Sequence, residues 1–226
     1  MQTKVLTFDS VTHELEGTKV LIPTISVGFI PMFTTELFVK ALDLPFFAAI
    51  DTDLVVPICS SDDQGVKLPI TLHGPIDDMY VLVLRSHPLR GQNVSFVQSV
   101  VSFLKSNRTI PIVLSSTDKT QFSPLHTTPF YMQPHGLTPS VELPIWQEEL
   151  PGGTGNTQKF IDLLSEPWLL LLGLGSDSFT VESVVDFVVG VAYVLGVELD
   201  RIKLSDFASR MLIQLERPRV GSLYLK

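Results

Sequence analysis

The sequence predicts an α/β domain in which one mixed or largely parallel sheet lies between two layers of helices. Short apolar runs alternate along the chain with longer segments whose apolar residues recur at helical spacing, a pattern typical of strands linked by helices. Hydrophobic residues make up 45% of the chain, which is enough for a buried core. No internal repeat or domain-sized linker interrupts the pattern. We therefore expect residues 1–226 to form a single three-layer domain.

The expected strands are apolar runs bounded by turn residues. They lie at residues 20–27, 46–51, 66–74, 79–86, 109–116 and 167–175. The turn-like sequence HGPIDD separates the third run from the fourth and predicts a hairpin or a meander there. Residues 117–157 are rich in Pro, Gly, Ser and Thr and show no clear period, so we expect a long irregular segment.

The expected helices follow from apolar spacing and from residues that suit helix starts. Pro31 fits the first turn of a helix after the first strand, because its missing N–H is not needed there. Asn93 is a suitable N-cap for a helix that runs through Lys105. Residues 180–195 are apolar on nearly all sides, so we expect that helix to be central in the packing. Residues 205–215 predict a last amphipathic helix.

Charge and composition narrow the class of protein. The 24 acidic residues outnumber the 16 basic ones, and the resulting charge of -8 argues against binding to nucleic acid or to an anionic membrane. Cys59 is the only cysteine, so no internal disulfide is possible and a reducing compartment is favoured. The longest apolar run contains Asp186 and is too short to span a membrane. We expect a protein of the cytoplasm and nucleus.

Two glycine-containing turns have part of the sequence pattern of a cofactor site. A dinucleotide site needs G-x-G-x-x-G, yet Gly28 stands alone and is followed by the bulky Phe29 and Ile30. Those two side chains would block a phosphate but suit packing against another protein. The stretch PGGTGNTQKF, residues 151–160, has three glycines but lacks the G-K-[ST] ending of a phosphate loop. It predicts a turn that opens a helix near Thr157, and we expect no cofactor.

Asp51 and Asp53 put two carboxylates at the end of an expected strand, where such a pair can hold a divalent metal ion. Alternate residues of a strand face the same way, so the two carboxylates could converge on Mg²⁺ or Mn²⁺. A solvated strand end or a helix cap is the favoured explanation, because short acidic pairs are common where loops begin, and no other obvious acidic ligand accompanies the pair. The histidines show no metal-binding spacing. The sequence therefore predicts no metal site.

Nucleophilic catalysis would need a serine or cysteine close to a histidine and an acid. Ser115 and Ser116 lie at the end of a strand, His126 and His135 lie in the next segment, and Asp118 is nearby. The G-x-S-x-G motif of a nucleophile elbow is missing. An enzyme of the hydrolase or phosphorylase type, using Asp51/Asp53 or Ser115/His126, remains the alternative function, and we expect no catalytic residues.

Several stretches, in the same order and spanning about residues 20–195, resemble one family. The most specific is an apolar residue, a proline and a Ser-Val-Gly turn before a helix, followed by a Thr-Asp-Leu-Val run. Its matching residues are Pro23, Ser26, Val27, Gly28, Thr52, Asp53, Leu54, Val55 and Pro57. A second anchor comprises Leu114, Ser115, Ser116, Thr128, Pro129 and Phe130. With these stretches and LPGGTGNTQKF, the chain resembles the proteasome assembly chaperone 2 family, although Phe29 replaces the usual asparagine.

The resemblance implies a non-enzymatic protein with a sheet like that of the nucleoside phosphorylases. It implies a heterodimer with proteasome assembly chaperone 1 that binds the forming 20S α-ring, promotes its assembly and prevents incorrect ring association. In this interpretation the turn with Phe29 and Ile30 joins a strand to a helix, and the two bulky side chains are candidates for partner contact.

The C-terminal sequence GSLYLK leaves two alternatives open. Some members of the family end in a hydrophobic residue, tyrosine and one further residue, a tail that docks between α-subunits. Here Tyr224 is third from the end, one position too early for that tail. In the docking alternative, Leu223, Tyr224, Leu225 and Lys226 contact the α-ring. In the other, the segment is a core strand, which the alternation of Leu223 and Leu225 with Tyr224 favours.

Overall fold

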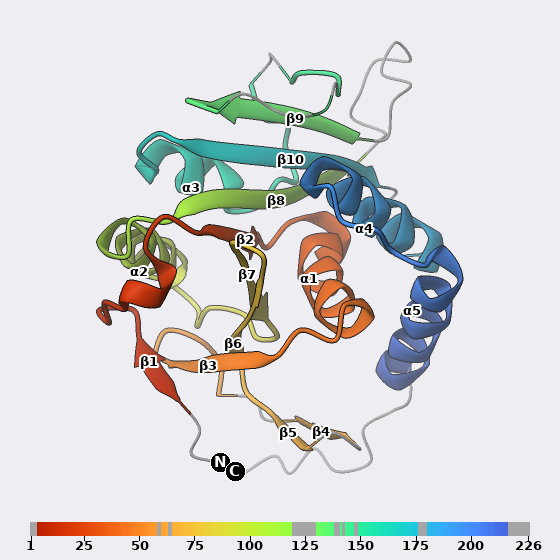
Figure 1. Cartoon of the computed structure of the whole chain (residues 1–226), viewed down its shortest axis with the longest axis horizontal. Helices are drawn as coiled ribbons and strands as arrows, with labels where there is room; N and C mark the ends of the chain where they lie inside the picture. The colour runs from red at the N-terminus through yellow and green to blue at the C-terminus, as the bar shows by residue number, and fades with distance from the viewer. Residues whose placement is uncertain are drawn as a thin grey trace.

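The protein folds around one mixed sheet of eight strands, in the order β1-β3-β6-β7-β2-β8-β10-β9 (Figure 1). The computed structural model describes residues 4–57, 60–62, 65–118, 130–137, 141, 143–146, 149–175 and 180–216. Strands β6 and β9 run antiparallel to their neighbours, and the other neighbouring pairs are parallel. The predicted α/β class with a mixed sheet is confirmed.

The helices and strands of the described residues have the following bounds. The strands of the large sheet are β1 Val5–Thr7, β2 Lys19–Pro23, β3 Phe46–Asp51, β6 Ile70–Ile76, β7 Met79–Leu84, β8 Ile110–Asp118, β9 Phe130–His135 and β10 Trp168–Gly175. The helices are α1 Ile30–Ala41, α2 Asn93–Ser106, α3 Thr157–Leu163, α4 Val181–Leu195 and α5 Arg201–Glu216, with short 3₁₀ turns η1 His13–Leu15 and η2 Val27–Phe29. A small hairpin pairs β4 Ser60–Asp62 with β5 Gly65–Lys67.

Helices cover both faces of the sheet. Helices α1, α4 and α5 pack on one another over one face, and α2 and α3 lie on the other (Figure 1). The alternation of strand side chains supplies both cores: in β2, Leu21 joins the cluster under α1 and α4, whereas Val20 and Ile22 join the cluster under α2. Within the described residues, none of the helices is long and apolar enough to cross a membrane.

Within the large sheet, the sequence missed two strands and placed the end of β2 too late. β9 lies inside the segment expected to be irregular, and β1 at the sheet edge was not foreseen. β9 forms because Phe130, Tyr131 and Met132 are buried against β10, with which the strand pairs antiparallel. β2 ends at Pro23, four residues earlier than expected, because the chain then turns sharply toward α1.

Candidate functional site

The candidate site lies where the carboxyl ends of the parallel strands meet, around the turn that joins β2 to α1. Such an edge is the usual ligand-binding position in open α/β sheets. The amide of Phe29 donates to the carbonyl oxygen of Ser26 over 3.1 Å. Gly28 has φ 69° and ψ 3°, the left-handed conformation that glycine favours in such a turn. The turn therefore has the sharp geometry that a phosphate-binding loop would also use.

Protein groups already accept hydrogen bonds from several amides of this turn. Ile25 N–H donates to Asn156 Oδ1 over 3.1 Å, and Val27 N–H donates to the Gly153 carbonyl over 3.0 Å. The glycine-rich segment 151–156 thus packs directly on the turn. A Cβ added at Gly155 would lie 1.6 Å from the Ile25 carbonyl oxygen, so glycine is needed for close backbone approach rather than for phosphate binding. This geometry supports the interpretation of the turn as a joint between packed elements.

Buried hydroxyl groups fill the space beneath the turn. Ser115 Oγ lies 2.7 Å from Thr157 Oγ1, which lies 2.9 Å from Thr24 Oγ1. In a second group, Ser116 donates its amide proton to Ser26 Oγ over 3.0 Å and its hydroxyl proton to the Val27 carbonyl over 2.7 Å. All of these hydroxyls are buried. The network supplies hydrogen-bond partners to polar groups that are buried away from water. Ser115 therefore has a structural role.

The structure separates His135 from Ser115 and leaves Asp51 and Asp53 exposed. His135 stacks on Trp168 at the opposite end of β10 from the residue that pairs with Ser115. Asp51 and Asp53 are exposed at the end of β3. Among the described residues, no three His, Cys, Asp or Glu side chains are grouped as a metal site would need. His126 lies outside the described residues.

Phe29 and Ile30, the two candidate contact residues of the turn, face different environments. Ile30 is 3% exposed and belongs to the core, so only Phe29 stays a candidate for partner contact. The phenyl ring of Phe29 is 43% exposed and meets the ring of His87 edge-on, with 5.0 Å between the ring centroids. The C-terminal candidates Leu223, Tyr224, Leu225 and Lys226 lie outside the described residues.

Two further exposed apolar residues near the turn were missed by the sequence analysis. Val94 is exposed in the first turn of α2, and Leu89 is exposed in the segment that joins β7 to α2. This segment is held beside the carboxyl edge, because Leu89 N–H donates to the Leu54 carbonyl over 2.8 Å. The available signal was an apolar residue inside the polar loop sequence HPLRGQN.

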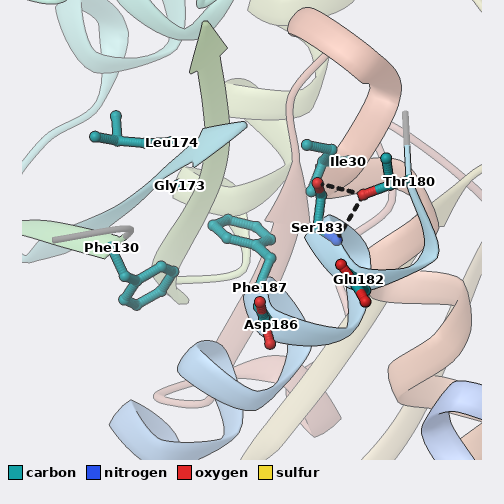
Figure 2. Close-up of a pocket in the computed structure, with 9 residues that line it drawn as sticks. All are labelled: Ile30, Phe130, Gly173, Leu174, Thr180, Glu182, Ser183, Asp186 and Phe187. Carbon is teal, nitrogen blue, oxygen red and sulfur yellow. Dashed lines mark hydrogen bonds between the residues drawn. The ribbon is translucent and has the colours of Figure 1, made fainter. Parts of the chain in front are cut away.

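A cavity of about 190 Å³ lies on the α4 side of the same turn (Figure 2). Phe130 and Phe187 form its aromatic floor with ring centroids 5.2 Å apart, and Ile30 lines its wall. Gly173 makes room for this floor, since a Cβ there would lie 2.4 Å from the Phe187 ring. Asp186, at the cavity, accepts a hydrogen bond from Arg201 over 2.5 Å. The cavity is therefore apolar at its base and bordered by charged groups.

A half-buried polar chain links α1 to the sheet. Arg85 Nε lies 3.4 Å from Glu36 Oε1, and Arg85 Nη1 donates to Thr71 Oγ1 over 2.9 Å. Thr71 Oγ1 in turn lies 3.0 Å from His73 Nε2. Burial, and secondarily the positive charge of Arg85, lower the pKa of His73 from 6.5 to about 4. His73 is thus neutral near pH 7, and this series of hydrogen-bonded side chains has a structural role.

Comparison with known proteins gives one family and several similar structures. A model of the PAC2 family matches residues 20–166. PbaA of Pyrococcus furiosus, an archaeal homolog of proteasome-assembly chaperone, is similar with a TM-score of 0.66 and 15% identity, covering 89% of this chain and 91% of that chain. PbaB of Pyrococcus furiosus, an archaeal proteasome activator, has a TM-score of 0.60 and 15% identity, covering 88% of this chain and 93% of that chain.

A third similar structure comes from a bacterium. It is a proteasome-assembly chaperone homologue of Mycobacterium tuberculosis, with a TM-score of 0.52 and 13% identity, covering 90% of this chain and 96% of that chain. At these identities the structures show a shared fold. Comparison with curated protein sequences gives no match.

Proposed function

The chain belongs to the PAC2 family, and on that premise we propose that it is a proteasome assembly chaperone that acts by binding other proteins. The match of the family model to residues 20–166, more than half of the chain, carries this proposal. The similar fold of PbaA, an archaeal homolog of proteasome-assembly chaperone, supports it. A shared fold alone does not decide function, so the family and the site carry the proposal.

The proposed mode of action is a heterodimer with proteasome assembly chaperone 1 that binds the forming 20S α-ring, promotes its assembly and prevents incorrect ring association. We place this activity in the cytoplasm and nucleus. Two features support a protein-binding role over a catalytic one. The segment 151–156 packs on the turn at the carboxyl edge of the sheet, and apolar side chains such as Phe29 are exposed there. The mean hydropathy of +0.31 is high for a chain that works alone, and obligate interfaces cover apolar surface of this kind.

Affinity purification from the cells of origin, followed by mass spectrometry of the co-purifying chains, tests the proposal. We expect proteasome assembly chaperone 1 and 20S α-subunits in near-stoichiometric amounts. Recovery of the chain without any proteasome-related protein would overturn the proposal.

The enzymatic alternative is tested with the same protein. Ser115→Ala and Asp53→Asn should leave the co-purifying chains unchanged, except through any loss of folding. A hydrolase or phosphorylase activity that either substitution abolishes, in a protein that still melts as the wild type does, would replace the chaperone proposal.

A further inference from the structure

The cavity between the end of β10 and the first turns of α4 has an apolar side and a polar side, and it is called the Phe130 cavity below (Figure 2). Its apolar side comprises Ile30, Phe130 and Phe187, and its polar side comprises Thr180, Glu182, Ser183 and Asp186. An apolar cavity of about 150 Å³ can hold a benzene molecule, so the volume of about 190 Å³ found here suffices for one ring with a short chain.

The aromatic floor of the Phe130 cavity is fixed before any ligand arrives. Phe130 and Phe187 are buried, and their rings meet edge-on with 5.2 Å between the centroids. Two glycines admit these rings, because a Cβ would lie 2.4 Å from the Phe187 ring at Gly173 and 3.3 Å from the Phe130 ring at Gly190. A preformed aromatic floor loses little entropy on binding and suits a ring-shaped apolar group.

The polar side carries an excess of negative charge. Glu182 and Asp186 are four residues apart in α4, so their side chains lie on the same face of the helix, and both are exposed. Arg201 donates to Asp186 over 2.5 Å and balances one of the two carboxylates. Glu182 takes part in no ion pair among the residues that the structure describes. The cavity therefore attracts a positively charged group.

The N-terminus of α4 does not reverse this preference. Helix N-termini favour anions through their unpaired amides and the helix dipole. Here Thr180 Oγ1 accepts from the amide of Ser183 over 3.1 Å, and the Glu182 carboxylate lies in the first turn. Protein groups thus already complement that end of the helix, and an anionic ligand would be repelled by Glu182.

We propose that the Phe130 cavity binds a small organic cation, a primary ammonium group carried by a short aromatic or branched aliphatic body. The body lies on the two phenyl rings. The three N–H donors of the ammonium group meet the Glu182 carboxylate and the hydroxyl oxygens of Thr180 and Ser183, which lie 2.7 Å apart. This ligand site goes beyond the proposed function, which requires protein partners only, and either can fail without the other.

The test uses phenethylamine as the probe, and isothermal titration calorimetry of the purified full-length chain at low salt measures its affinity. We expect saturable binding at one site. Phenethyl alcohol has the same ring but no charge, and it should bind roughly tenfold more weakly, because a charged donor makes the stronger hydrogen bonds. Hydrocinnamate, which has the opposite charge, should show no saturable binding.

Two substitutions locate the site. Glu182→Gln keeps the shape of the side chain and removes its charge, so it should weaken the binding of phenethylamine roughly tenfold while the melting temperature changes little. Its matched control is Glu198→Gln, which lowers the net charge by the same amount at an exposed position beyond the C-terminal end of α4 and should leave the affinity within about twofold of the wild type. Ser183→Leu enlarges a side chain that lines the cavity, so it should abolish the binding of both phenethylamine and its alcohol.

Four outcomes would overturn the inference. A wild-type chain without saturable binding of phenethylamine would remove the ligand class. Equal affinities for phenethylamine and phenethyl alcohol would show that the carboxylates take no part. Equal losses in Glu182→Gln and Glu198→Gln would show that only the net charge of the chain attracts the amine. Unchanged binding by Ser183→Leu, in a protein that melts as the wild type does, would place the site elsewhere; if that variant does not fold, the comparison of the two glutamine variants decides.

Discussion

At Gly155 the backbone has φ 62°, and an added Cβ would lie 1.6 Å from the Ile25 carbonyl oxygen. Gly155→Ala therefore combines backbone strain with a collision between two backbone segments, neither of which can move freely. We expect it to lower the free energy of unfolding by about 2–5 kcal/mol, measured by urea denaturation.

Gly196 provides the matched control for this substitution. It has a similar φ of 69° at the C-terminus of α4, but an added Cβ would meet nothing within 4 Å. Gly196→Ala should therefore cost only the strain, about 1–2 kcal/mol. Equal losses at the two positions would show that segment 151–156 is not pressed against the turn.

His73 makes the stability of the folded chain depend on pH. Burial and the charge of Arg85 lower its pKa to about 4, whereas the unfolded chain takes up the same proton near pH 6.5. Between these values the unfolded state binds more protons, so stability is complete above pH 6.5 and is lost as the pH falls toward 4. The loss attributable to His73 should reach up to about 3 kcal/mol. Denaturation of wild type and His73→Gln at pH 7, 6 and 5 measures it, and identical slopes for the two proteins would contradict the assignment.

Thr157, the first residue of α3, connects that helix to strand β8 and to the end of β2. Its hydroxyl meets those of Ser115 and Thr24 in a buried network. Thr157→Val keeps the shape but leaves the Ser115 hydroxyl without its partner, so we expect a loss of about 1–3 kcal/mol. The double variant Ser115→Ala, Thr157→Val removes both hydroxyls and should lose less than the sum of the single variants. Strict additivity in thermal or urea unfolding would show that the two groups are not coupled.

The elements that the sequence predicted well are those whose apolar pattern is local. The run at 46–51 became β3 with the same bounds, and the apolar stretch at 180–195 became α4. β9 was missed because Gln133 and Pro134 break its apolar pattern, and the strand depends on pairing with β10 far along the chain. Long-range pairing of this kind leaves little local signal.

The candidate site was predictable only in part for the same reason. The sequence shows a bulky residue, Phe29, directly after Gly28, and this predicts that the turn binds no phosphate. The left-handed backbone of Phe29 and the position of Leu89 beside the same edge follow from tertiary contacts. Ile30 shows the limit most clearly: it is as apolar as Phe29, yet one peptide unit later the side chain points into the core.

For the whole molecule, the proposed heterodimer predicts that the chain associates when it is purified alone. Exposed apolar side chains on several elements, among them Val5, Phe29, Ile145 and Tyr193, would lack their partner surface. The net charge of -8 opposes contact between two copies, and salt screens that repulsion. We therefore expect the average mass of the isolated chain at micromolar concentration to rise between 0.05 and about 0.5 M NaCl, a range over which the screening length falls well below about 10 Å. Co-expression with proteasome assembly chaperone 1 should instead give a complex whose mass does not change with salt. Light scattering after size exclusion measures both masses, and an isolated chain that stays monomeric at both salt concentrations would show that it needs no partner.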